Sequence, residues 1–369
     1  YRLDRQRYGG EYARYYDFLT ESQRFSREEL LEYQGEKLRE LVAHAYSTVP
    51  YYRELFDGIN LKPTDVRGVE DLHKIPLLRK EEFKDNPQRL MSTKYDPRDL
   101  VKGHTSGTTG SPLDVWYDKA GIYIAYAALA RHYDWAGSRL ARDGDRIAVA
   151  RGNMIVPIHV RKPPYWRYNW YHNQLLLSTF HMSPRTLDHY FQELERFQPS
   201  VLDGYPSTLY VLAKHLQNSG RKFPLRAAIT SSETLFDFQR ETIEESFDCR
   251  VFDYYALAER SAFAGECEHH FKRHLAMEYA VTEVTDDKGE PLPAGTEGLL
   301  VGTRLHNKGM PLSRYVTNAR TAIVPDACPC GRALELMEEV TTKAEDTITL
   351  RDGRLISPSV LTHPFKPLH

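Results

Sequence analysis

The sequence predicts an α/β protein in which a mostly parallel sheet, flanked by helices, is joined to a smaller β subdomain. Between residues 146 and 261, short apolar segments alternate with segments of helical periodicity, an order typical of parallel strands joined by crossover helices. From residue 276 onward, apolar and polar residues alternate around the turn sequence DDKGEP, which is typical of antiparallel strands. The fold class follows from this change of periodicity along the chain.

The composition is that of a globular protein with a substantial core. Of the 369 residues, 41% are hydrophobic and 27% are charged, which are ordinary values, and the length suggests about two domains. The net charge of −2 gives no reason to expect a nucleic-acid surface. No apolar run reaches the ~18 residues of a membrane helix, and the charged, aromatic N-terminus is unlike a signal peptide. We expect a cytoplasmic protein without nucleic-acid or membrane partners; a homodimer is left open.

The first part of the chain is predicted to be helical. Apolar spacing and Glu/Lys pairs predict a helix over 27–48. Pro50 begins a second, short helix in VPYYRELF. Residues 71–86 are predicted to form a loop followed by a polar helix.

The central part alternates strands and helices. Strands are predicted in RIAVAR (146–151), VLDG (201–204), LRAAITSSE (225–233) and CRVFDYY (249–255). Helices are predicted over 187–197, from Pro206 to Gly220, and from near Glu233. Ligands of parallel sheets bind at the carboxyl ends of strands. The candidate residues at those ends are Gly204, Ser231, Glu233, Tyr255 and Glu259.

The stretch HTSGTTGSPLD, at 104–114, is a run of small hydroxyl residues and glycines. Such a run forms neither a good helix nor a good strand, but its N–H groups and hydroxyls can surround an anion such as a phosphate. A Walker P-loop is excluded, because only two residues separate Gly107 from Gly110 and no lysine follows. The alternative is a flexible linker.

Tyr255 and Glu259 follow the last strand of the central part. An aromatic ring can stack on a purine, and a carboxylate can hold Mg²⁺. The chain contains 24 tyrosines, so the pair taken alone is more often structural than functional.

Four cysteines occur in a chain without a secretion signal, which favours thiols or a metal site over disulfides. Cys267, Cys328 and Cys330, together with a histidine of CEHHFKRH (267–274), provide three sulfurs and an imidazole. This is the ligand set of a closed, structural zinc site. The alternative is free thiols beside a surface histidine cluster. Cys249 lies in an apolar strand and is expected in the core.

Six motifs appear in the order and approximate spacing of the adenylate-forming ligases: TSGTTGSPL, GYPS, ITSSETL, YYALAE, MPLSRYVTNA and KAEDTI. VPYYRELF, ERSAFAGECEHH and CPCGR resemble one branch, that of phenylacetate–CoA ligases and capsular-polysaccharide ligase-like proteins. The resemblance extends from about residue 35 to the end of the chain. It implies the fold of the large N-terminal domain of these enzymes.

The resemblance implies two half-reactions. A carboxylic acid, by default an aryl acid, attacks ATP to give an acyl-adenylate and pyrophosphate. The acyl group then passes to CoA, although related enzymes use an amine or a carrier-protein thiol. Charge neutralisation at the phosphates and accurate positioning are what such a step requires of the protein.

The resemblance also implies roles for individual residues. Glu259 would bind Mg²⁺, and Thr105 and Thr108 would act with it in catalysis. The other nucleotide-binding positions are Ser106, Gly107, Thr109, Gly110, Ser231, Ser232, Glu233, Tyr254, Tyr255 and Asp346. The acyl-pocket positions are Tyr205, His181 and Ala256. Among the histidines of CEHHFKRH, the resemblance favours His274 as the zinc ligand over His269 and His270.

These roles divide the chain into four segments: an N-terminal helical segment (1–97), an α/β nucleotide- and acid-binding core (98–275), a β subdomain with the zinc site (276–345), and a hinge with the start of a truncated C-terminal domain (346–369). The family has a mobile C-terminal domain with a catalytic lysine. Because the chain ends at His369, soon after the hinge, we expect that domain to be absent.

Two departures from the family pattern favour an alternative function. Where the motif Tyr-x-Thr-Gly-Asp supplies a carboxylate to the ribose, this chain has Ala319, a loss of about 1.5–3 kcal/mol in nucleotide binding. The cation that often follows the phosphate loop is replaced by Ser111 and Leu113. The alternative is a degenerate relative that binds a ligand or partner without adenylating. A zinc-dependent hydrolase is not favoured, because the sequence contains neither H-E-x-x-H nor G-x-S-x-G.

Overall fold

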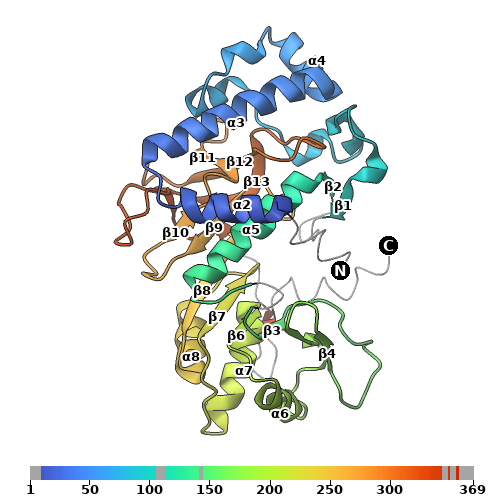
Figure 1. Cartoon of the computed structure of the whole chain (residues 1–369), viewed down its shortest axis with the longest axis vertical. Coiled ribbons are helices and arrows are strands. Elements are labelled where there is room, and N and C mark those ends of the chain that lie inside the picture. Colours follow the sequence, from blue (N-terminus) through green and yellow to red (C-terminus); the bar gives the residue numbers. More distant parts are fainter. Residues whose placement is uncertain (1–9, 105–112, 141–143, 343–347, 350–354, 357–369) are drawn as a thin grey trace. The chain divides into compact units, whose positions relative to one another are not determined.

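The chain divides into two compact units in the computed structural model, which describes residues 10–104, 113–140, 144–342, 348–349 and 355–356 (Figure 1). Unit 1 comprises residues 1–131 and 255–344, and unit 2 comprises residues 132–254 and 345–369. Unit 1 therefore combines the N-terminal helices with strands more than a hundred residues later in the sequence. The boundaries of these two units differ from those of the four functional segments expected from the sequence. The four segments are defined by function rather than by compactness, and they stay a prediction.

Unit 1 begins with three helices, α2 (Gly10–Ser22), α3 (Arg27–Thr48) and α4 (Pro50–Gly58). The predicted helix over 27–48 and the short helix at Pro50 are confirmed. A capping box begins α3: the Ser26 hydroxyl accepts from the Glu29 N–H, and the Glu29 carboxylate accepts from the Ser26 N–H at 2.7 Å. Two of the otherwise unpaired N–H groups at the helix start are satisfied in this way.

The predicted polar helix within 71–86 is wrong. This segment forms only short 3₁₀ turns, Val69–Lys74 and Lys80–Glu82. Between them the backbone of Leu78 is extended: its N–H donates to Arg314 and its carbonyl accepts from Val316. Backbone pairing with a distant strand has therefore replaced the local helical bonds, which a reading of local periodicity cannot detect.

The antiparallel β part of unit 1 is confirmed. One sheet has the strand order β11 (Ala280–Thr285), β12 (Gly298–Arg304), β13 (Tyr315–Thr321) and β16 (Thr341–Thr342). Further antiparallel pairing joins β9 (Phe263–Glu266), β10 (Arg273–Leu275), β15 (Leu336–Met337) and β14 (Ile323–Val324). A hairpin of β1 (Val101–His104) and β2 (Asp114–Tyr117) flanks the predicted phosphate loop.

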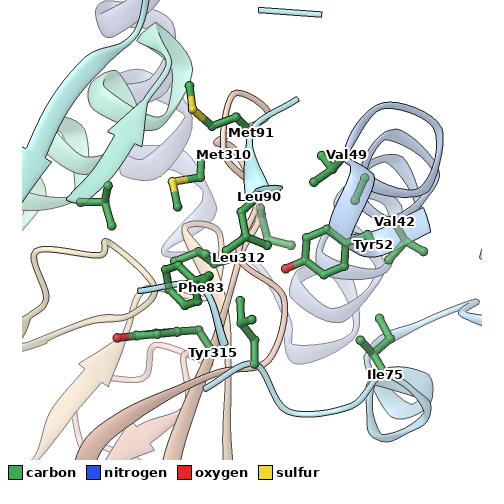
Figure 2. Packing of buried hydrophobic residues seen from close by; sticks show 14 of the residues in the cluster. Val42, Val49, Tyr52, Ile75, Phe83, Leu90, Met91, Met310, Leu312 and Tyr315 are labelled. Carbon is green, nitrogen blue, oxygen red and sulfur yellow. The ribbon is translucent and has the colours of Figure 1, made fainter. Parts of the chain in front are cut away.

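The core of unit 1 joins the N-terminal helices to the β part. Val42 and Tyr52 from the helices pack in one cluster with Phe83, Leu312 and Tyr315 (Figure 2). The rings of Phe83 and Tyr315 meet edge to face with centroids 6.1 Å apart. Tyr315 is therefore held firmly from one side, which matters because its hydroxyl reaches a candidate catalytic residue.

A buried ion pair also ties the helices of unit 1 together. Arg131, in α5 (Lys119–Trp135), donates to Glu278 at 2.7 Å, and the two side chains are 2% and 0% exposed. Ser22 of α2 donates to the same carboxylate at 2.5 Å. Because the pair is fully desolvated, removing one charge would leave the other without compensation.

Replacing Glu278 with glutamine is therefore expected to lower the free energy of unfolding by about 3 kcal/mol. Urea unfolding of the variant and the unmodified protein measures this difference. Glu335→Gln is the matched control, since Glu335 pairs with Arg27 at the surface and its loss is expected to cost less than about 1 kcal/mol. Equal effects of the two substitutions would contradict the importance assigned to the buried pair.

Unit 2 has a sheet of β8 (Arg250–Ala256), β7 (Ala227–Ser231), β6 (Val201–Gly204), β3 (Ile147–Ala150), β5 (Gln174–Leu177) and β4 (Trp166–Asn169), in that order. All neighbours are parallel except the β4–β5 pair. The predicted mostly parallel sheet is confirmed. The unit also contains the short antiparallel pair β17 (Ile348–Thr349) and β18 (Leu355–Ile356).

Three helices share one core with this sheet: α6 (Leu187–Phe197), α7 (Pro206–Asn218) and α8 (Asp237–Phe247) (Figure 1). The first two match the predicted positions. The third begins at Asp237 rather than near Glu233, because the backbone of Phe236, directly before it, is extended, with φ −83° and ψ 151°. Among the described residues, no helix is both long and apolar enough to cross a membrane.

Candidate active site and metal cluster

Glu259 lies in unit 1, shortly after β8, and its side chain is buried at 9% exposure. The hydroxyl of Tyr315 donates to its Oε1 at 2.7 Å. Burial, together with the carboxylate charge, raises the pKa of Tyr315, so the phenol stays a donor at neutral pH. Within the described residues, the other carboxylate oxygen accepts no hydrogen bond that would compete with a metal ion. A buried, oriented carboxylate of this kind is suited to binding Mg²⁺.

Tyr255 lies at the end of β8, also in unit 1. It packs against an apolar cluster that contains Leu300, Met337 and Ala319. Burial raises its pKa. Ala319 stands where the family supplies a carboxylate to the ribose. It is therefore part of an apolar cluster against which Tyr255, the ring predicted to stack on adenine, packs.

Ala256 and the phosphate-loop candidates belong to unit 1, and the hinge candidate Asp346 belongs to unit 2. Ala256 is exposed at the end of β8. The phosphate-loop candidates Thr105, Ser106, Gly107, Thr108, Thr109 and Gly110, and the hinge candidate Asp346, lie outside the described residues. Their roles stay predictions.

In unit 2, polar side chains converge at the carboxyl ends of β3, β6, β7 and β8. Arg151, directly after β3, donates to Asp203 at 2.6 Å, to the Tyr254 hydroxyl at 2.8 Å and to Ser231 at 3.2 Å. Ser231 in turn lies 3.3 Å from the Ser232 hydroxyl. The structure thus brings together three of the predicted nucleotide-binding residues.

The sequence reasoning missed Arg151 as the centre of this group, and it gave Asp203 no role. Both occupy the carboxyl ends of parallel strands, β3 and β6, which is the signal that could have found them. Burial opposes the charge of Arg151, but the Asp203 carboxylate outweighs it and raises the arginine pKa. Arg151 is therefore a charged side chain that holds Asp203, Ser231 and Tyr254 in place by hydrogen bonds.

Glu233 has a structural partner. Its Oε2 accepts from the backbone N–H of Ser207 at 3.1 Å, in the first turn of α7. A carboxylate at a helix N-terminus is favourable for the helix itself. The helix contact does not by itself indicate a nucleotide, so binding by Glu233 stays a prediction.

The acyl-pocket candidates of unit 2 are Tyr205 and His181. Tyr205 precedes α7, and burial raises its pKa. The ring of His181 stacks on Tyr165 with centroids 5.0 Å apart, and its Nδ1 lies 2.8 Å from the Ser178 hydroxyl. Its Nε2 is buried without a hydrogen-bond partner in the described part of the chain. This nitrogen could bind a polar group of a ligand.

Cys267, His274, Cys328 and Cys330 form one cluster in unit 1, with ligand atoms that all lie within 4.8 Å of one another. The Cys267 and Cys328 sulfurs are 3.6 Å apart, and Cys330 Sγ lies 3.4 Å from His274 Nε2. Tetrahedral zinc holds such atoms roughly 3.5–3.8 Å apart. The residues present therefore fit zinc, with the ligand set expected from the sequence.

The elements around this cluster explain its geometry. His274 is on β10, Cys267 follows β9, and the two strands are antiparallel neighbours. Burial and nearby arginines lower the pKa of His274 to about 4, so the ring is neutral at neutral pH.

The other candidates lie outside the cluster. His270 Nδ1 lies 3.5 Å from the Glu266 carboxylate. Cys249 is a free, half-buried cysteine that packs against the core of unit 2.

Comparison with known proteins identifies the family of this chain. A phenylacetate–coenzyme A ligase of Thermus thermophilus is 30% identical to this chain over 348 residues, which is 90% of the chain and 75% of that protein. The chain belongs to the phenylacetate–coenzyme A ligase family. Protein CapK of Staphylococcus aureus is 30% identical over 245 residues, covering 64% of the chain and 52% of CapK. No family model matches the sequence.

A crystal structure of 2-hydroxyisobutyryl-CoA ligase has the same fold as this member of the phenylacetate–coenzyme A ligase family. It superposes with a TM-score of 0.70 at 19% identity, covering 93% of this chain and 74% of that chain. The resemblance inferred from the motifs, the α/β fold of adenylate-forming ligases and the assignment to ligases are confirmed.

Proposed function

We propose that this protein activates a carboxylic acid with ATP, releases pyrophosphate, and transfers the acyl group from the adenylate to CoA. The observation that carries the proposal is the buried Glu259 carboxylate, oriented by Tyr315 at 2.7 Å. Membership of the phenylacetate–coenzyme A ligase family supports CoA as acceptor, ahead of an amine or a carrier-protein thiol.

Each residue has a proposed task. Glu259 would hold Mg²⁺, which neutralises phosphate charge as pyrophosphate leaves. Tyr315 keeps the carboxylate in one orientation, so little reorganisation is needed at the moment of reaction. Thr105 and Thr108 are proposed to contact the phosphates, and Tyr255 the adenine. Arg151 positions Ser231 and Tyr254.

An aryl acid is proposed as substrate. His181, whose ring stacks on Tyr165, offers an aromatic surface, and within the described residues its buried Nε2 has no hydrogen-bond partner. Tyr205, in the same unit, contributes a further aromatic ring. An aromatic surface favours an aromatic acid over a short aliphatic one.

Pyrophosphate release tests this proposal. The full-length gene product is incubated with ATP, Mg²⁺ and a panel of aryl and aliphatic acids, and CoA is added in a second series. We expect acid-dependent release that is largest with aryl acids, and thioester formation only when CoA is present. Release with aliphatic acids alone would overturn the substrate class without overturning the ligase activity.

Ala319 supports a second candidate, a relative that binds a ligand or partner without adenylating. Its methyl group is buried at 4% exposure within the apolar cluster around Met337, so no side-chain carboxylate is provided from this position. No pyrophosphate release with any acid, together with no heat of ATP binding by calorimetry, would favour this candidate.

We further propose that Cys267, His274, Cys328 and Cys330 bind a structural zinc ion. Four protein ligands leave no open position for a substrate, and the ligands come from three separate places in the chain that the metal would hold together. Elemental analysis of the purified protein is expected to give about one zinc per chain.

A further inference from the structure

Arg304 is a buried cation without a hydrogen-bond acceptor. It is the last residue of β12 in unit 1, and it is 2% exposed. Within the described part of the chain, its Nε, Nη1 and Nη2 make no hydrogen bond. A guanidinium has five N–H donors and stays protonated at neutral pH. Buried charged groups that lack both partners and water are strongly unfavourable, so this arrangement requires an explanation.

The charged neighbours do not compensate Arg304. Glu259 attracts it electrostatically, but in the described part of the chain no hydrogen bond joins this carboxylate to the guanidinium, whose donors stay unpaired. A second cation, Arg260, lies near the same tyrosine: the Arg260 and Arg304 guanidinium carbons are 4.2 and 6.0 Å from the centroid of the Tyr117 ring. The Tyr117 ring face attracts both cations, but it accepts no conventional hydrogen bond from Arg304.

The backbone of Arg260 also has an unusual conformation. Its φ of 56° is left-handed, a conformation that costs a non-glycine residue energy. Strained residues of this kind concentrate at functional sites. The Arg260 guanidinium lies over the Tyr117 ring, and one of its N–H groups donates to the Gly121 carbonyl at 3.2 Å.

A small cavity lies between these groups. It is lined by Arg304, Arg260, Tyr117 and Tyr279, among others, and has a volume of about 10 Å³. This is room for one water-sized particle. A phosphate or carboxylate group is too large, whereas a monatomic anion would accept several N–H donors at once and neutralise a positive charge.

We propose that this cavity between Arg304 and Arg260 is a binding site for one monovalent anion of halide size, chloride being the obvious occupant. Arg304 supplies the unpartnered donors, Arg260 supplies the second positive charge, and the tyrosine rings exclude bulk water. The site would stabilise unit 1, and it does not depend on the ligase proposal.

A bromide experiment locates the ion directly. Crystals of the full chain grown in sodium bromide are expected to give an anomalous-scattering peak within hydrogen-bonding reach of Arg304. Bromide peaks confined to the molecular surface would overturn the proposal.

Thermal unfolding tests the energetics. In sodium chloride the melting temperature of the unmodified protein is expected to exceed that in sodium gluconate of equal ionic strength by about 2 °C or more, because gluconate is too large for the cavity. Arg304→Met is expected to abolish this chloride-specific increment. Without its buried charge, the variant should unfold in gluconate at a temperature no lower than that of the unmodified protein.

Arg98→Met is the matched control. Arg98 is 88% exposed and pairs with Asp96, so this variant loses the same charge without touching the cavity and should keep the increment. Equal melting temperatures of the unmodified protein in the two salts would indicate that water alone fills the cavity, and an increment that survives Arg304→Met would place the anion elsewhere. Either result would refute the proposed site.

Discussion

Replacing Glu259 with glutamine is expected to lower acid-dependent pyrophosphate release about a hundredfold or more. The substitution removes a negative charge but keeps the shape of the side chain. The amide oxygen can still accept from the Tyr315 hydroxyl, which now lies 2.7 Å from Oε1. The expected loss therefore reports on binding of Mg²⁺ rather than on the packing around Tyr315.

The Mg²⁺ dependence distinguishes this explanation from general damage. Raising the Mg²⁺ concentration should recover part of the activity of Glu259→Gln, while the urea midpoint should match that of the unmodified protein. Glu297→Gln is the control, because Glu297 is an exposed carboxylate paired with Arg320 at the surface. Full activity of Glu259→Gln at limiting Mg²⁺ would show that the metal assignment is wrong.

Replacing Cys328 with serine is expected to remove the bound zinc and to lower the free energy of unfolding by on the order of 5 kcal/mol. A serine hydroxyl is a poor zinc ligand at neutral pH, and the remaining Cys267, Cys330 and His274 would be left as three ligands in a partly buried cluster. Elemental analysis and urea unfolding measure the two effects on the same samples.

Cys249→Ser provides the matched control for this experiment. Cys249 belongs to unit 2 and lies outside the cluster, so its replacement should leave the zinc content unchanged and cost only the small loss expected of a half-buried side chain. Absence of metal from the unmodified protein would remove the zinc site, and equal zinc loss in both variants would assign the metal to another place.

Local sequence patterns were sufficient for much of the fold. The helix over 27–48 follows from apolar spacing and from the capping box at Ser26, both of which act over a few residues. The central strands could be predicted because each is a short apolar run next to a helix. The segment 71–86 could not be predicted this way, because pairing of Leu78 with β13 depends on residues more than two hundred positions away.

For the candidate site, the sequence alone determined the kinds of residue: a hydroxyl-rich loop, the Tyr255–Glu259 pair, three cysteines and a histidine, and the family they indicate. The tertiary structure alone decided which of these side chains are buried, oriented or already occupied. Tyr315 orients Glu259, α7 engages Glu233, Arg151 gathers Ser231 and Tyr254, and His274 rather than His270 faces the cysteines. The physical reason is that residue identity fixes which chemical groups are present. Their burial and their hydrogen-bond partners are set only when distant segments pack together.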